Sequence, residues 1–235
     1  MTVKHIMSEL EEKGNPNTKK VLLKHGVKEP FFGVKVSDMK VIQKRVKKDY
    51  QLSKDLYATG NSDAMYLAGL IADESKMTKK DLTTWVKQAK SPNIFDYTVP
   101  WIASESQFGQ ELALEWIDAK ESYIAAAGWS TLCSLVSIKS DDDLNLPLLK
   151  SLLARVEKDI HMADNSVRSR MNIFVISVGC YVSSLTDKAL ASAQKIGAVN
   201  VDVGDTSCKV PDALDYINKV KAKGTIGKKK KMARC

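Results

Sequence analysis

Helical periodicity is the feature that most limits what this chain can fold into. Apolar residues recur three and four positions apart, in segments bounded by turn residues, and this spacing places them on one face of an α-helix. The segments that follow it are Ser37–Lys48, Asp63–Ile71, Lys79–Ala89, Ile94–Ala103, Gly109–Asp118, Ser122–Leu135, Leu146–Lys158, Ser166–Tyr181, Thr186–Ala193 and Pro211–Ala222. The short alternating run Ala198–Val203 lies between two glycines, so we predict a loop there. The expected fold class is all-α.

The spacing of these helices indicates an array of helix pairs. Helices of about 10 to 16 residues with short connections give pairs of roughly 35 to 40 residues, the period of HEAT-type arrays. We therefore expect an α-solenoid of HEAT-like helical repeats, an α-α superhelix, over residues 1–222 as a single domain, followed by a basic C-terminal tail at residues 223–235. A helical bundle without repeats is the alternative. One tryptophan falls in each of four successive predicted helices, as expected for packing anchors: Trp85, Trp101, Trp116 and Trp129.

Membrane, metal and cofactor functions find no support in the sequence. No uninterrupted apolar stretch reaches roughly 18 residues, the length that a membrane-spanning helix needs. The four cysteines are scattered without a CxxC pair, and the three histidines lie far from one another. We expect a monomeric cytoplasmic protein with reduced thiols, without a metal or small-molecule cofactor.

The net charge of +8 is concentrated at the two ends of the chain. Residues 19–48 hold ten Lys or Arg against Glu29 and Asp38, and residues 221–235 hold seven basic residues and no acid. Like charges at this density repel one another, and a polyanion neutralises them. The two segments therefore favour a nucleic acid, DNA or RNA, as the partner. For the tail taken alone, a solubilising role is an equal alternative.

Candidate phosphate contacts come from the two basic segments. Segment Ser37–Lys48 begins with a predicted Ser cap and places Met39 and Ile42 opposite its lysines. The candidate nucleic-acid-binding residues of the two segments are Lys35, Lys40, Lys44, Arg45, Lys228, Lys229, Lys230 and Lys231.

Three segments in order resemble the AlkD-type HEAT-like-repeat DNA alkylation repair family. They are Phe31–Ser37, Ser91–Pro100 and Val167–Val175, and together they span roughly residues 20–185. The resemblance implies a horseshoe of HEAT-like helix pairs that holds duplex DNA in a basic concave groove. Some members of the family are glycosylases that excise cationic 3- or 7-alkylpurines, which leave readily because they already carry positive charge.

The resemblance also implies a catalytic carboxylate at Asp96, which stabilises the oxocarbenium-like sugar and positions a water. The alternative for Asp96 is a capping residue near a helix start. The resemblance also implies two DNA-binding residues on a later helix, because a basic family position aligns with Arg170 and a lesion-side Trp aligns with Phe174. Phe174 has helical spacing to other apolar residues, so core packing is its alternative role. Two further family positions differ in this sequence: Pro92 stands where the family has a Trp, and Ala126 where it has an Arg. Losing both groups removes much of the transition-state stabilisation that one carboxylate needs around it.

Three hypotheses about function follow. The first is a DNA-binding protein of the alkylation repair superfamily that holds duplex or distorted DNA, with weak or absent glycosylase activity. The second is an active DNA N-glycosylase, a hydrolase that uses Asp96. The third is a HEAT-type protein-interaction scaffold.

Overall fold

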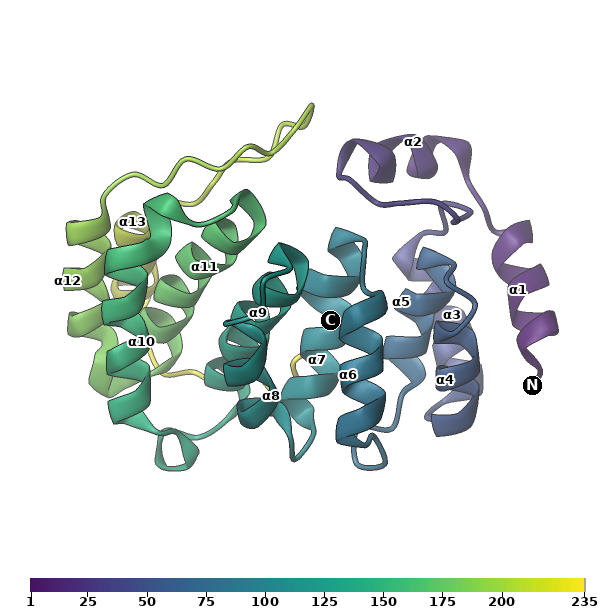
Figure 1. Cartoon of the computed structure of the whole chain (residues 1–235), viewed down its shortest axis with the longest axis horizontal. Helices are drawn as coiled ribbons and strands as arrows, with labels where there is room; N and C mark the ends of the chain where they lie inside the picture. Colours follow the sequence, from purple (N-terminus) through teal and green to yellow (C-terminus); the bar gives the residue numbers. More distant parts are fainter. Residues whose placement is uncertain (235) are drawn as a thin grey trace. The chain divides into compact units, whose positions relative to one another are not determined.

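The computed structural model describes residues 1–234 and contains α-helices, short 3₁₀ turns and one π-helical turn, with no strand in that range. The all-α prediction is confirmed. The chain divides into two compact units. Unit 1 comprises residues 1–108, 204–206 and 234, and unit 2 comprises residues 109–203 and 207–233 (Figure 1).

Unit 1 is a stack of short helices. They are α1 (Val3–Glu12), α2 (Pro16–Lys24), α3 (Val36–Val46), α4 (Tyr50–Tyr57), α5 (Ser62–Ile71), α6 (Lys79–Gln88), the π-helix η1 (Ile94–Thr98) and α7 (Val99–Glu105). Helices α3 and α4 pack on α5, and α6 packs on α7. A side-chain oxygen caps the N-terminus of α4, α5 and α6, from Asp49, Asn61 and Thr78 respectively.

Helix α5 forms the core of unit 1. Every residue of α5 except Tyr66 is buried, as its apolar composition predicts. Helix α5 also approaches η1 closely, because a Cβ on Gly69 would lie 2.4 Å from Cγ2 of Thr98. This contact leaves room only for glycine and fixes η1 against the core.

Unit 2 contains α8 (Gly109–Trp116), α9 (Ser122–Ile138), α10 (Leu146–Asp159), α11 (Asn165–Tyr181), α12 (Thr186–Ile196) and α13 (Ala213–Ala222). The most extensive packing is between α9 and α11, the two longest helices. Of the described residues, no single helix is long and apolar enough to cross a membrane. The one pair that together has the length and composition, Asn165–Tyr181 with Ser183–Ile196, is bent by 115°.

The predicted helices all have counterparts in the structure, and the differences are local. Ile94–Ala103 divides into η1 and α7, and the structure adds α1, α2 and α4, which the periodicity did not predict. The Ser37 cap is wrong, because α3 begins one residue earlier and its N-cap is Lys35. Residues 198–203 are without regular structure, as predicted. The four tryptophans are buried, as packing anchors should be.

Candidate nucleic-acid interface

Helix α3 carries a row of lysines on the side away from its buried residues. Met39 and Ile42 face the core, whereas Lys40 and Lys44 are four residues apart and so share the opposite side of the helix. These two positions span about 6 Å of helix axis, about two base-pair steps along a duplex. Lys47 follows as the C-cap of α3, with a φ of 63°.

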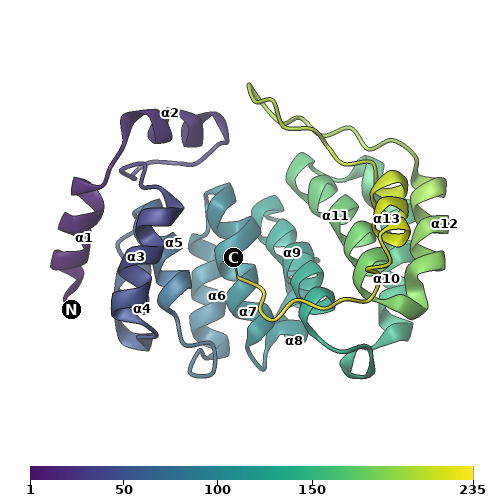
Figure 2. The same ribbon diagram turned by 180° about the vertical axis from the view of Figure 1, so that it is seen from behind.

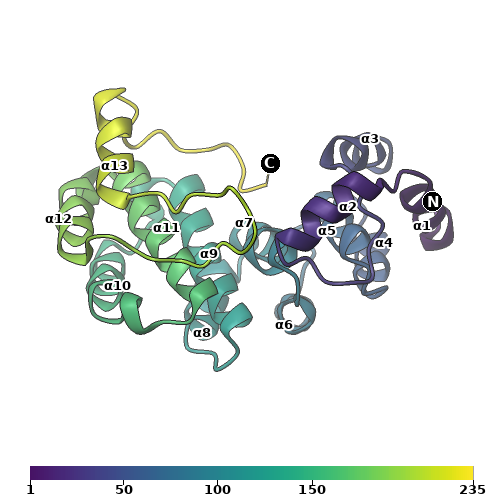
Figure 3. The same ribbon diagram turned by 90° about the horizontal axis from the view of Figure 1, so that it is seen from above.

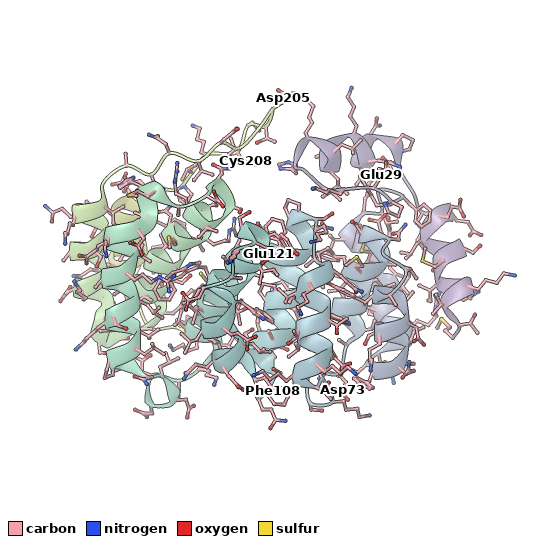
Figure 4. The ribbon with its side chains drawn as sticks, viewed as in Figure 1. Glu29, Asp73, Phe108, Glu121, Asp205 and Cys208 are labelled. Carbon is pink, nitrogen blue, oxygen red and sulfur yellow. The ribbon has the colours of Figure 1, made fainter. Side chains whose placement is uncertain are left out.

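These lysines differ from most of their neighbours in having no acidic partner. Among residues 19–48, ion pairs join Lys19 to Glu29 at 2.8 Å, Lys24 to Asp205 at 2.6 Å, Arg45 to Glu9, and Lys48 to Glu74 (Figure 4 labels Glu29 and Asp205). In residues 1–234 no carboxylate lies within ion-pair distance of the remaining cations of this segment: Lys20, Lys28, Lys35, Lys40, Lys44 and Lys47. Of the candidates on α3, the lysines are therefore uncompensated and Arg45 is not.

A buried carboxylate holds the loop that leads into α3. The Oδ2 atom of Asp63 accepts hydrogen bonds from the backbone N–H groups of Phe32, Gly33 and Val34 at 2.7, 2.8 and 3.4 Å. Burial raises the pKa of Asp63 above its usual value, while these three donors act in the opposite direction. Asp63 was predicted only as the start of a helix, and its part in positioning Lys35 has no signal in the local sequence.

Gly33 completes this loop because no other residue fits. Its φ of +84° lies in the left-handed region. A Cβ there would lie 2.7 Å from the backbone nitrogen of Lys19 and 2.8 Å from the carbonyl oxygen of Asn15. The Phe31–Ser37 segment, one of the three that support the family resemblance, therefore contains the end of the loop between α2 and α3 and the first residues of α3.

Asp96 lies in the middle of the π-helical turn η1 and is partly buried. The turn has a local cause: Pro100 has no N–H to offer the carbonyl four residues earlier, which is that of Asp96, and its ring would collide with that carbonyl in a regular α-helix. In the wider turn the N–H of Val99 bonds instead to the carbonyl of Ile94. Single π turns inside helices occur frequently at functional sites.

Aromatic rings gather next to Asp96. Tyr97 is 44% exposed and its ring centroid lies 5.9 Å from that of Trp101, which in turn contacts Tyr66 edge-on at 5.5 Å. Pro92, at the position where the family has Trp, is partly buried. Tyr97 is thus the exposed aromatic residue adjacent in sequence to the candidate carboxylate.

The candidates on α11 lie in unit 2 and differ in accessibility. Arg170 is partly buried, with its guanidinium 3.3 Å from the Ser169 hydroxyl. Phe174 is fully buried and contacts Trp129 edge-on at 5.2 Å between centroids, so it packs in the core and its ring is not accessible to DNA. Ala126, where the family has Arg, is also fully buried. The expectation that Arg170 and the α3 lysines share one surface stays a prediction.

The basic tail is folded against the protein. Figure 2 shows the segment after α13, in yellow, passing one end of α9, where the N–H of Lys230 bonds to the carbonyl of Ser137 and Lys229 Nζ bonds to the carbonyl of Val136. Lys229 also pairs with Asp141 at 2.8 Å, and Lys230 Nζ lies 5.6 Å from the Tyr181 ring centroid. Lys228 and Lys231 are exposed.

Arg234 is the more buried of the two tail cations that pair with acids, Lys229 and Arg234. Its side chain is only 7% exposed and, within unit 1, pairs with Glu74 at 2.6 Å and Glu105 at 2.8 Å. The same guanidinium donates to the backbone carbonyl of Leu70 at 3.2 Å. Burial opposes the charge, but the two carboxylates outweigh it and raise the pKa of Arg234.

The fold and the site together describe an all-α protein of stacked helices, whose N-terminal unit carries lysines without an acidic partner in residues 1–234. The sequence profile described as "DNA alkylation repair enzyme" matches residues 6–216, and the chain belongs to this DNA alkylation repair family. The resemblance drawn from the sequence is confirmed.

Relatives and a solved structure agree with this assignment. "Uncharacterized protein Lin0241" of Listeria innocua is 32% identical and "Uncharacterized protein Lmo0209" of Listeria monocytogenes is 31% identical, each over 226 residues that cover 94% of this chain and 98% of the relative. A solved structure, 35% identical over the full length of both chains with a TM-score of 0.92, is described as "a new family of proteins related to the HEAT-like repeat DNA glycosylases with affinity for branched DNA structures". The HEAT-like fold prediction is thereby confirmed.

Proposed function

We propose that this protein binds distorted or branched DNA through its phosphates, with weak or absent glycosylase activity. The observation that carries the proposal is the set of lysines on and around α3 that have no acidic partner in residues 1–234. Uncompensated cations at helical spacing attract phosphates without reading bases, so the binding should show little sequence preference. The affinity of the similar solved protein for branched DNA supports this choice of partner.

A salt titration tests the proposal directly. If about five phosphates are neutralised, the logarithm of the affinity for a four-way junction should fall against the logarithm of salt concentration with a slope of about −4.5. Fluorescence anisotropy with a labelled junction and a linear duplex of the same arm sequence gives both slopes. An affinity that hardly responds to salt contradicts phosphate binding and favours the protein-interaction scaffold.

Two groups outside α3 belong to the same proposal. Arg170 in unit 2 and the exposed tail residues Lys228 and Lys231 are further candidate phosphate contacts. Lys229 is the weakest of the tail candidates because its ammonium is engaged by Asp141 and a backbone carbonyl.

A DNA N-glycosylase is the second candidate, favoured by the position of Asp96 in a π turn beside the exposed ring of Tyr97. In this role the carboxylate would stabilise an oxocarbenium-like sugar and hold the attacking water. Buried Ala126 supplies no cation where the family has an Arg, so we expect slow excision at most. Single-turnover release of 7-methylguanine from a defined duplex decides the question, with Asp96→Asn as the matched variant. Full activity in that variant would remove Asp96 from the mechanism.

A further inference from the structure

Helix α2 differs from every other α-helix in the described chain in burying none of its residues. Two of its apolar side chains are about half exposed, Val21 at 53% and Leu23 at 48%. Figure 3 shows α2 lying across one end of α5. Helix α2 thus keeps two aliphatic side chains in solvent and has no buried face of its own.

Contacts at its ends and one lysine keep α2 in place. The side chain of Asn15 caps Thr18, and the N–H of Asn15 bonds to the carbonyl of Gly33. Lys19 pairs with Glu29 and lies 5.1 Å from the ring centroid of Phe31. The helix is therefore an ordered element that is held by its polar groups and leaves Val21 and Leu23 exposed, while Leu22 is partly buried.

Leu23 and Val21 lie on different sides of this helix. They are two residues apart, which places them about 200° apart around the axis. Leu23 is one turn from Lys20, a lysine without an acidic partner in residues 1–234. Val21 is one turn from Lys24, whose ammonium pairs with the exposed carboxylate of Asp205. The Leu23 side thus combines an apolar group with a free cation, next to the Lys19–Glu29 pair, whereas the cation one turn from Val21 is already paired with Asp205.

We infer that Leu23 is a wedge that covers the uncovered face of a base pair at a DNA branch point, with Lys20 on the adjoining phosphate. The inference rests on the proposed function and adds a determinant of specificity to it. Within a continuous duplex each base pair is stacked on both faces, so inserting an apolar side chain costs the unstacking of a step. At a branch point the terminal base pair of an arm offers a face without that cost. Leu23 therefore favours branched over linear DNA, while the lysines favour both alike.

The test compares three single variants on a four-way junction and on a linear duplex at one salt concentration. Leu23→Ser should lower affinity for the junction about tenfold and change that for the duplex less than twofold. Lys20→Ala should weaken both by about the same factor. Val21→Ser is the matched control, equally exposed and on the other side of α2, and should bind both DNAs as the original protein does.

A fluorescent base analogue at the branch point gives a second readout. We expect 2-aminopurine emission there to change on binding of the original protein and to stay nearly constant with Leu23→Ser. If the original protein binds the junction and Leu23→Ser keeps its preference, or Val21→Ser loses it equally, the wedge is wrong and the proposed function stands. If the original protein binds neither DNA, both fail. A dimer that Leu23→Ser dissociates in sedimentation would assign this side of α2 to a second copy and overturn the wedge.

Discussion

Two lysine-rich segments of this chain have nearly the same charge in the sequence and differ in what their paired cations contact in the structure. Residues 19–48 carry +8 and residues 221–235 carry +7. In the first segment more than half of the cations have no acidic partner in residues 1–234. In the second, Lys221, Lys229 and Arg234 pair with acids, and the last two also donate to backbone carbonyls, which fixes the tail on the protein. Lys230 lies over a tyrosine ring.

The difference teaches that a charge run does not by itself report a binding surface. A cation that is already paired gives up its partner before it can bind a phosphate, and the exchange has little net benefit. An uncompensated lysine has only water to lose. Variants that remove members of the paired and unpaired groups test this contrast.

Arg234→Ala should have the largest effect, on stability. It leaves Glu74 and Glu105 without the guanidinium that lies between them, and removing one member of a buried ion pair costs about 3 kcal/mol. Urea unfolding followed by circular dichroism measures this loss. Lys231→Ala, which removes the same charge from an exposed position, should change the free energy of unfolding by less than about 0.5 kcal/mol. Equal stability of the two variants would show that the tail is not structural.

The triple variant Lys35→Ala, Lys40→Ala, Lys44→Ala should have the next largest effect, on DNA binding. Three fewer phosphate contacts reduce the steepness of the log–log salt plot by about 2.7 and weaken the low-salt affinity roughly 30-fold, about 2 kcal/mol. Stability should stay nearly constant, because these side chains make no ion pair in residues 1–234. The double variant Lys228→Ala, Lys231→Ala is the comparison from the tail. If it reduces the salt dependence more than the triple variant does, the assignment of the two segments is reversed.

Glu157 lies outside both lysine-rich segments and pairs with two lysines, Lys188 and Lys195. Its carboxylate accepts hydrogen bonds from Ser192 at 2.6 Å, Lys195 at 2.9 Å and Lys188 at 2.9 Å, which lower its pKa from 4.5 to about 2. A carboxyl whose pKa is lower in the folded state stabilises the fold above pH 4.5, and this contribution is lost as the pH falls towards 2.

Glu157→Gln should therefore lower stability at pH 7 by about 1.5 kcal/mol, a figure discounted because both lysines are partly exposed to solvent. The deficit should shrink as the pH falls towards 2, where about half of the original carboxylate is protonated as well. Chemical unfolding at a series of pH values checks both statements. The control is Glu121→Gln, an exposed residue on the same unit. A pH-independent deficit would mean that the glutamate acts through packing and not through its charge.

Much of the fold followed from the sequence because periodicity reports burial. Helix α5, apolar on almost every side, was predicted within one residue. Helix α2 buries no residue and so has no apolar stripe to detect, although Asn15 and Pro16 form a recognisable start signal. Helices α1 and α4 are different, because each has two buried apolar residues four apart that could have indicated them, Ile6 with Leu10 and Leu52 with Leu56.

The candidate site was less predictable because pairing joins residues that are distant in the chain. The guanidinium of Arg234 meets Glu105 and Glu74 across 129 and 160 positions of sequence. No local pattern reveals such a partner. The same limit applies to Asp63, which holds backbone N–H groups about thirty residues earlier. The sequence therefore shows which segments are basic. Which of their cations pair with a carboxylate is shown only by the fold.

Two adjacent lysines of the tail, Lys228 and Lys229, give the smallest effect that we expect and separate a structural role from a DNA-binding role. Lys229→Ala removes an ammonium that bonds to Asp141 and to the carbonyl of Val136, and should cost about 1 kcal/mol of stability. Lys228→Ala removes the same charge from an exposed side chain and should leave stability unchanged.

When DNA affinity is measured in place of stability, we expect the larger loss for Lys228→Ala and the smaller loss for Lys229→Ala. A tail that acts only as a diffuse positive charge predicts equal losses of affinity in the two variants, because each removes one elementary charge from adjacent positions. A tail in which Lys229 is already engaged predicts a measurable loss for Lys228→Ala and almost none for Lys229→Ala. Thermal unfolding and junction binding on the same two samples therefore decide whether the paired cations of the tail belong to the fold or to the interface.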